Sequence, residues 1–241
     1  MSECRIAYFD CCAGASGDMI LAALLDAGLP LTELQAGLDA LHLPITVQVE
    51  GVHKGAIRAT QVCVVAEDDA HSRTLAEIEA LVSAADLPEI ARAEALRIFR
   101  RLGEAEAAVH GEAVESIHLH EVGGLDTIAD VVGAVLGLRA LGVERVSISS
   151  LPLGGGTTSS RHGAIPLPAP AVAALLHGWP VRGVDVEAEL VTPTGAAILT
   201  TLAAEAGPLP AMTVERSGYG AGQRDLPFPN VLRVWLGHQS A

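Results

Sequence analysis

Residues 5–18 read Arg5-Ile6-Ala7-Tyr8-Phe9-Asp10-Cys11-Cys12-Ala13-Gly14-Ala15-Ser16-Gly17-Asp18. Residues 5–9 are mostly apolar and predict a short buried strand that ends at Asp10. A glycine-rich turn follows, and the apolar segment 19–27 predicts a helix that is closed by Gly28. A strand, a glycine-rich turn and a helix in this order are typical of α/β folds, and they direct free backbone N–H groups toward an anion. The stretch therefore predicts an α/β fold with an anion-binding turn at residues 14–18.

Five side chains or glycines of this stretch are candidate site residues. Gly14, Ser16 and Gly17 are candidates for binding an organic ligand, because backbone can approach a ligand closely there. Asp10 ends the strand, where α/β proteins tend to place functional groups, and it is a candidate catalytic residue together with Asp18. The alternative for Ser16 or Asp18 is a simple helix cap, which these residue types commonly provide. The two roles are compatible.

The rest of the chain extends the α/β pattern. Segments 45–52 and 57–65 alternate like strands with one solvated face, and 143–149 reads as a buried, parallel-type strand. Residues 88–110 predict a long amphipathic helix. The apolar positions expected in the core on that helix are Ile90, Leu96, Phe99 and Leu102. We therefore expect one α/β domain over residues 1–241, a mixed sheet with helices packed on it and glycine-rich loops at one edge.

Composition narrows the class of function. The 241 residues are 50% hydrophobic but only 3% aromatic, so the core must consist mainly of Ala, Val, Leu and Ile. The formal net charge of −14 argues against general nucleic-acid binding, which uses a basic surface. No apolar segment is long enough to span a bilayer, and the four cysteines show no CxxC spacing. We expect a cytoplasmic protein with reduced thiols and with neither nucleic acid nor membrane as a partner.

A second stretch carries a candidate metal site. It reads His118-Leu119-His120-Glu121-Val122-Gly123-Gly124-Leu125-Asp126-Thr127-Ile128-Ala129-Asp130. In an extended segment His118 and His120 point to the same side. Imidazole and carboxylate together suit a divalent ion such as zinc, nickel or iron. The candidate metal ligands are His118, His120, Glu121 and Asp126, with His71 from a polar loop as a further candidate.

Each of these residues also has a structural interpretation. His118 and His120 can satisfy hydrogen bonds in the core, and Asp126 stands where a carboxylate caps a helix. Asp130 is four residues after Asp126, so a helix places both carboxylates on one face. A carboxylate one turn into an Ala/Val/Leu-rich helix needs a partner, which makes Asp130 a third catalytic candidate.

Two further turns have the character of anion-binding loops. Residues 151–163 contain three consecutive glycines, several hydroxyls, an arginine and an imidazole, from which Gly155 and His162 are candidate ligand-binding residues. Residues 192–195 read Thr-Pro-Thr-Gly at the expected start of a helix and contribute Thr192, Thr194 and Gly195. Neither a P-loop, a GxGxxG fingerprint nor a GxSxG elbow occurs, so an ordinary NTPase, dinucleotide enzyme or α/β-hydrolase is not indicated.

Taken together, these motifs resemble the LarC family, the nickel insertion proteins of nickel-pincer cofactor biosynthesis. The resemblance runs in order from Ile6 to Gly237. The segments that carry it are residues 8–10, 14–19, 104–107 with His110-Gly111, 118–123, 126–130, His162-Gly163 before Pro166, 189–196, 218–220 and 229–233.

The resemblance implies a reaction and its cofactors. Proteins of this family insert nickel into a pyridinium bis-thiocarboxylate mononucleotide in a CTP-dependent manner, which makes them nickel chelatases, that is, metal-inserting lyases. Soft sulfur would displace harder protein ligands from the nickel. The implied partner is an anionic, mononucleotide-like small molecule, and the implied cofactors are nickel, CTP and a second divalent cation, Mg or Mn.

The sequence departs from the family pattern in two ways, and these departures leave alternative functions open. Family members continue past the residue 229–233 motif into a C-terminal region linked to nucleotide binding and oligomer assembly, which we expect to be absent here. They also carry a more histidine-rich loop where this chain has only His71. We therefore expect a homo-oligomer whose CTP use needs a separate C-terminal partner chain. The alternatives are a non-catalytic nickel-binding subunit of a split enzyme, or a metal-dependent phosphohydrolase using Asp10, Asp126 and Asp130.

Overall fold

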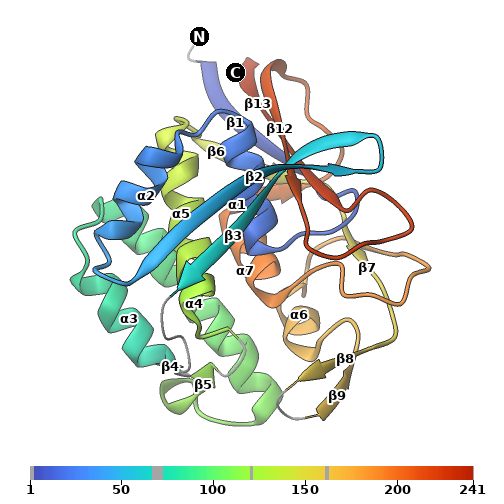
Figure 1. Cartoon of the computed structure of the whole chain (residues 1–241). Helices are drawn as coiled ribbons and strands as arrows, with labels where there is room; N and C mark the ends of the chain where they lie inside the picture. Colours follow the sequence, from blue (N-terminus) through green and yellow to red (C-terminus); the bar gives the residue numbers. More distant parts are fainter. Residues whose placement is uncertain (1–2, 67–72, 120–121, 161–162, 241) are drawn as a thin grey trace.

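A mixed seven-stranded sheet with helices on it forms the centre of the protein (Figure 1). In this computed structural model, residues 3–66, 73–119, 122–160 and 163–240 are described. The strand order is β11-β6-β1-β13-β12-β3-β2. The strands of this sheet are β1 (Glu3–Asp10), β2 (Ile45–Lys54), β3 (Ile57–Ala66), β6 (Arg145–Ile148), β11 (Ala203–Ala206), β12 (Thr213–Ala221) and β13 (Val231–Ser240). The prediction of a mixed α/β fold is confirmed.

The predicted strand at the start of the chain lies inside this sheet. β1 pairs in parallel with β6 on one side and antiparallel with β13 on the other, where Tyr8 lies opposite Trp235. β6 also pairs in parallel with β11. β12 joins the two halves of the sheet, since it is antiparallel to β13 and parallel to β3.

Helices stack in layers against this sheet (Figure 1). Their bounds are α1 (Gly17–Asp26), α2 (Leu31–Asp39), α3 (Leu75–Ala84), α4 (Glu89–His110), α5 (Leu125–Ala140), α6 (Pro170–Leu175) and α7 (Pro193–Leu202). α1 packs directly on β12 and β3, α5 packs on α1, and α4 packs on α5 together with α3, α6 and α7. Among the described residues, no helix is both long and apolar enough to cross a bilayer.

Two glycines of β12 allow α1 to approach the sheet closely. A Cβ added to Gly220 would overlap the carbonyl oxygen of Met19, and one added to Gly218 would overlap that of Ala23. Both carbonyls belong to the α1 backbone. The glycines thus set the distance between α1 and the sheet, and with it the position of the α1 N-terminus.

Short strand pairs lie outside the large sheet. They are β4 (Arg73–Thr74) with β5 (His118–Leu119), β7 (Leu151–Leu153) with β10 (Val181–Gly183), and β8 (Thr157–Ser160) with β9 (Gly163–Pro166). The expected loop at residues 151–163 therefore contains strand structure.

The long helix differs in one detail from the sequence-based expectation. Ile90 was expected in the core but is 60% exposed, whereas Phe99 and Leu102 are fully buried as predicted. The buried face is shifted toward Ala91 and Ala95. Small alanines lie where α4 meets its neighbours, so the larger Ile90 side chain near the start of the helix points outward.

Candidate functional site

A cavity of about 490 Å³ lies where the N-termini of α1, α5 and α7 meet. The helix-start residues that line it are Ser16, Gly17 and Asp18 of α1, Asp126, Thr127 and Asp130 of α5, and Thr192, Pro193 and Thr194 of α7. β3 and β8 contribute further wall residues. Each helix N-terminus carries a partial positive charge of about half a unit, so three of them favour an anionic ligand here.

Two of the predicted turns are joined directly by backbone hydrogen bonds. The Ala15 N–H donates to the Leu190 carbonyl over 2.9 Å, and the Thr192 N–H donates to the Ala15 carbonyl over 3.1 Å. Gly14 has a φ of +147°, and a Cβ there would overlap the Leu190 carbonyl oxygen. A Cβ at Gly195 would likewise overlap the Ala15 carbonyl oxygen. The glycines at 14 and 195 thus permit the close contact of the two turns.

Asp18 both caps its helix and faces the cavity. Its Oδ1 accepts a hydrogen bond from the Met19 N–H over 2.9 Å and another from the Ser16 hydroxyl. Its Oδ2 accepts from the Gln223 amide over 3.4 Å, and the same amide donates to the Val62 carbonyl. The capping interpretation and the ligand-site interpretation of this turn are therefore compatible.

Asp126 and Asp130 share one face of α5, as the spacing predicted, and both line the cavity. Asp126 is exposed, and its Oδ1 accepts the Thr127 N–H over 2.7 Å. Asp130 is only 9% exposed, and its Oδ1 has no hydrogen-bond partner among the described residues. Burial, followed by the charges of Asp18 and Asp126, raises the pKa of Asp130 well above its ordinary value.

We expect Asp130→Asn to stabilise the protein in the presence of a chelator at neutral pH. An unpartnered buried carboxylate costs at least about 1 kcal/mol, which corresponds to about 2–4 °C in Tm for a chain of this size. The folded state keeps the Asp130 proton to higher pH than the unfolded chain, because its pKa is raised on folding. Wild-type stability should therefore fall as pH rises from about 3.9 through the folded-state pKa, and the variant should lack this part of the slope.

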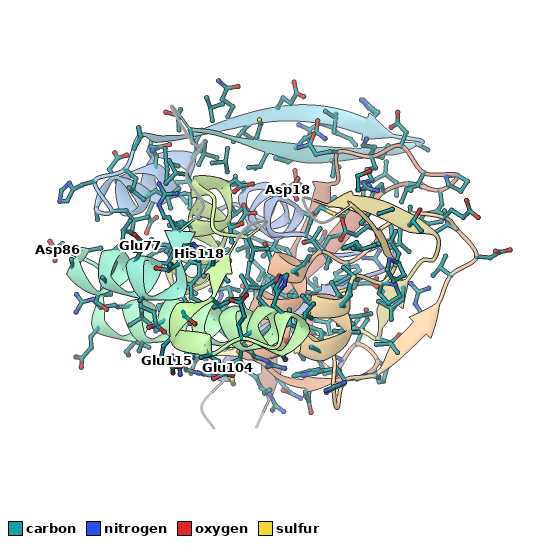
Figure 2. The ribbon with its side chains drawn as sticks, turned by 90° about the horizontal axis from the view of Figure 1, so that it is seen from below. Asp18, Glu77, Asp86, Glu104, Glu115 and His118 are labelled. Carbon is teal, nitrogen blue, oxygen red and sulfur yellow. The ribbon has the colours of Figure 1, made fainter. Side chains whose placement is uncertain are left out.

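Thermal unfolding across pH measures this effect. The matched control is Asp86→Asn, since Asp86 is exposed beyond α3 and outside the cavity (Figure 2). Equal pH slopes for the wild type and Asp130→Asn would contradict the expected cost of the buried carboxylate.

Asp10 and Gly155 do not line the cavity, although the sequence suggested them as site residues. Asp10 accepts a hydrogen bond from Arg233 at 2.5 Å, and this guanidinium lies 4.6 Å from the ring centre of Trp235 and 5.8 Å from that of Tyr219. The Gly155 N–H donates to the Val186 carbonyl. The proposed roles of Asp10 and Gly155 thus receive no support from their positions.

His118 lies in β5, opposite Thr74 of β4, and its side chain is exposed. Figure 2 shows it beside Glu77 and apart from Asp18. Hydrogen bonds from Thr74 lower the pKa of Glu77, and the charge of His118 adds a smaller effect in the same direction.

His71, His120, Glu121 and His162 lie outside the described residues. Within the described residues, no three His, Cys, Asp or Glu side chains are grouped so as to hold a metal ion. The metal ligand set therefore stays a prediction.

Four of the ionisable or amide side chains that line the cavity were not selected from the sequence. They are Cys63, Glu189, Gln223 and Arg224. The Arg224 guanidinium lies 3.6 Å from the Glu189 carboxylate. Glu189 lies three residues before Thr192, so its nearness to the predicted turn could have identified it from the sequence. The other three come from a solvated strand face and a connection, where nothing local distinguishes them.

A family model described as "nickel insertion protein" matches residues 7–241. The chain belongs to the nickel insertion protein family. A relative from Desulfitobacterium hafniense (strain DSM 10664 / DCB-2) is 47% identical over 234 residues, covering 97% of this chain and 58% of its own length. One from Nocardioides sp. (strain ATCC BAA-499 / JS614) is 49% identical over 233 residues, covering 96% of this chain and 59% of its own length. Both are named pyridinium-3,5-bisthiocarboxylic acid mononucleotide nickel insertion protein.

This chain thus spans less than two thirds of the length of these nickel insertion proteins. No solved structure matches it. Four of the sequence motifs have a clear place in the structure of this family member. Segments 14–19, 126–130 and 189–196 contribute to the cavity, whereas 218–220 holds α1 against the sheet.

Proposed function

We propose that this chain takes part in inserting nickel into the pyridinium-3,5-bisthiocarboxylic acid mononucleotide for which its relatives are named, giving the nickel-pincer cofactor. The observation that carries the proposal is the cavity at which three helix N-termini and several carboxylates meet, in a chain that belongs to the nickel insertion family. Its volume of about 490 Å³ lies in the range of small-molecule sites.

The precursor would bind through its anionic groups. Such a molecule has a phosphate and two thiocarboxylates, which the helix N-termini of α1 and α7 suit. Hydroxyl donors at Thr158, Ser159 and Thr194 line the same space. The turns at residues 14–18 and 192–195, already selected from the sequence, would therefore orient the substrate.

Nickel is the second substrate, and its proposed ligands remain His118, His120, Glu121 and Asp126, with His71. Asp126 lines the cavity, and so does Val122, which directly follows the His118–Glu121 segment in the chain. Insertion would be a ligand exchange in which soft sulfur of the precursor displaces imidazole and carboxylate. Asp18 and Asp130 are the proposed catalytic carboxylates, whereas the ion pair of Asp10 with Arg233 supports a structural role for Asp10.

We also propose that CTP use belongs to the part of the relatives that this chain does not match, so that cofactor formation needs that part as well. A phosphohydrolase centre built on Asp10, Asp126 and Asp130 is less well supported, because Asp10 lies outside the cavity that the other two line. The overall reaction would then be that of a nickel chelatase.

The experiment combines the protein with nickel, the precursor and CTP, with and without the C-terminal region of a relative, and measures formation of the nickel cofactor. Nickel affinity is measured in parallel for His118→Ala/His120→Ala. Because loss of even an outer partner of a metal ligand costs about 10–100-fold in affinity, this variant should lose at least about tenfold. The control is His53→Ala/His177→Ala, two exposed histidines outside the cavity.

Two outcomes would each overturn a different part of this proposal. Unchanged nickel affinity in His118→Ala/His120→Ala would overturn the ligand set. Nickel binding without cofactor formation in any combination would overturn the insertion function and leave a nickel carrier.

A further inference from the structure

Charge is distributed unevenly over the wall of the cavity. The described residues that line it include a single guanidinium, that of Arg224, and four carboxylates, those of Asp18, Asp126, Asp130 and Glu189. Three of the carboxylates belong to the start of α1 and to α5. The fourth, Glu189, is the one that pairs with Arg224. The cavity therefore has one part where negative charge predominates and another where it is compensated.

Contacts of the α1 start place these two parts beside different residues. A Cβ at Gly17 would overlap Oδ2 of Asp130, so a carboxylate of α5 lies against the first turn of α1. The next residue, Asp18, accepts a hydrogen bond from Gln223, which is the chain neighbour of Arg224. Arg224 thus reaches the cavity beside Asp18, and its ion pair links it to the segment that leads into α7.

The α7 side of the cavity has the features of a phosphate subsite. α7 has no acidic residue in its first turn, unlike α1 and α5, so its positive end is not neutralised there. Thr194, and Thr158 from β8, line the same cavity with hydroxyl groups.

The ion pair leaves Arg224 able to bind a ligand. The Glu189 side chain is only 16% exposed, whereas that of Arg224 is 52% exposed, and the two groups lie 3.6 Å apart. A guanidinium has five N–H donors, so Arg224 can keep Glu189 on one edge and donate to a phosphate from another. Paired N–H donors of this kind match phosphate oxygens in geometry as well as in charge.

We propose that Arg224 binds the phosphate of the mononucleotide and so directs the pyridinium ring toward the carboxylates of α5. The identity of the mononucleotide rests on the proposed function, and this orientation deepens that function by assigning the two ends of the substrate. The ring of an N-substituted pyridinium carries a positive charge, which the carboxylates of Asp126 and Asp130 attract.

The buried carboxylate of α5 supports this orientation independently of Arg224. Asp130 is only 9% exposed and lines the cavity, and its Oδ1 has no hydrogen-bond partner among the described residues. Such a group is costly unless a donor or a cation compensates it, and a cationic ring beside α5 offsets part of that cost. The thiocarboxylates on the ring then lie on the side of Asp126, which is a proposed nickel ligand.

The first test compares two ligands that differ only in the phosphate, nicotinic acid mononucleotide and nicotinic acid riboside, by calorimetry. Wild type should bind the mononucleotide at least about tenfold more tightly, since one charge-assisted hydrogen bond has about this effect on affinity. Arg224→Ala should lose the preference while its affinity for the riboside stays unchanged. Arg224→Lys should keep part of it, because the ammonium retains the charge but not the paired donors. The matched control is Arg58→Ala, an exposed arginine of β3 outside the cavity, which should bind both ligands as wild type does.

The second test varies the charge of the ring. Nicotinamide mononucleotide and its reduced form have the same phosphate, but only the oxidised form has a cationic ring. In the presence of a chelator, wild type should bind the oxidised form about two- to fivefold more tightly, and Asp126→Asn should reduce this ratio. The control Asp86→Asn should leave the ratio unchanged.

Each outcome bears on a separate part of the inference. Equal losses of affinity for mononucleotide and riboside in Arg224→Ala, or no preference for the mononucleotide in wild type, would overturn the phosphate subsite. Equal affinity of wild type for the two redox forms would overturn the orientation. If Arg224→Ala forms the nickel cofactor with the wild-type KM for the precursor, the inference is wrong and the proposed function stands. If the phosphate preference depends on Arg224 but no cofactor forms in any combination, the proposed function is wrong and the phosphate subsite stands.

Discussion

Gly220→Ala is expected to lower the free energy of unfolding by about 3 kcal/mol or more. The added Cβ would overlap the Met19 carbonyl oxygen and lie 2.7 Å from the Ala23 nitrogen. Both are backbone atoms of α1, so no side chain can rotate to make room. The helix must move away from β12, and its contacts with the core residues beneath it weaken. Urea unfolding followed by circular dichroism measures the change.

The matched control for this prediction is Gly183→Ala. Gly183 also lies in a strand, β10, but nothing lies within 4 Å of the position of an added Cβ. Its substitution should change stability by less than about 0.5 kcal/mol. If Gly220→Ala proves equally mild, close packing of α1 on β12 is not what requires glycine there.

The same glycines show why β12 was not predicted from the sequence. Residues 213–217 of β12 are exposed, and the strand continues through Gly218 and Gly220, so it has neither an apolar run nor a clear alternation. Glycine-rich sequence of this kind is typical of turns. β1 and α1, in contrast, were predicted close to their observed bounds because each has a strong local signal.

The alternation of side chains along β1 would have predicted the position of Asp10 more accurately. Ala7 and Phe9 belong to the main hydrophobic core beneath the helices. Side chains alternate along a strand, so Tyr8 and Asp10 face the opposite side of the sheet. The Tyr8 hydroxyl donates to Gly207 there, and Asp10 pairs with Arg233. The position of Asp10 at the end of a strand suggested a functional residue. Because side chains alternate between the two faces of the sheet, however, Asp10 faces away from the cavity.

The candidate cavity shows which site residues local sequence patterns can identify and which they cannot. Ser16, Asp18, Thr192 and Thr194 were selected because each stands at a predicted helix start, and Asp130 because a buried carboxylate needs a partner. All five line the same cavity. Sequence patterns identify helix starts but not which of them meet, because that depends on contacts between segments more than 100 residues apart, such as Ala15 with Val191. Arg224 and Gln223 reach the cavity only through this long-range arrangement.

Gly14→Ala should be the most damaging substitution for the site itself. At a φ of +147° an alanine is strained, and its Cβ would overlap the Leu190 carbonyl oxygen, which accepts the Ala15 N–H in the junction of the two turns. We expect a loss of about 3 kcal/mol or more in unfolding free energy, measured by urea unfolding, and lower affinity for the proposed mononucleotide substrate. Gly155→Ala is the matched control, since its Cβ would meet open space.

A double variant tests whether the junction between the turns acts as one unit. Gly195→Ala should also destabilise the protein, because its Cβ would overlap the Ala15 carbonyl oxygen from the other side of the same junction. Once Gly14→Ala has separated the turns, the second substitution has less to disrupt, so the double variant should lose less than the sum of the two single losses. Additive losses would show that the two glycines act independently. In that case the joined turns would not be what holds the α1 and α7 N-termini at the cavity.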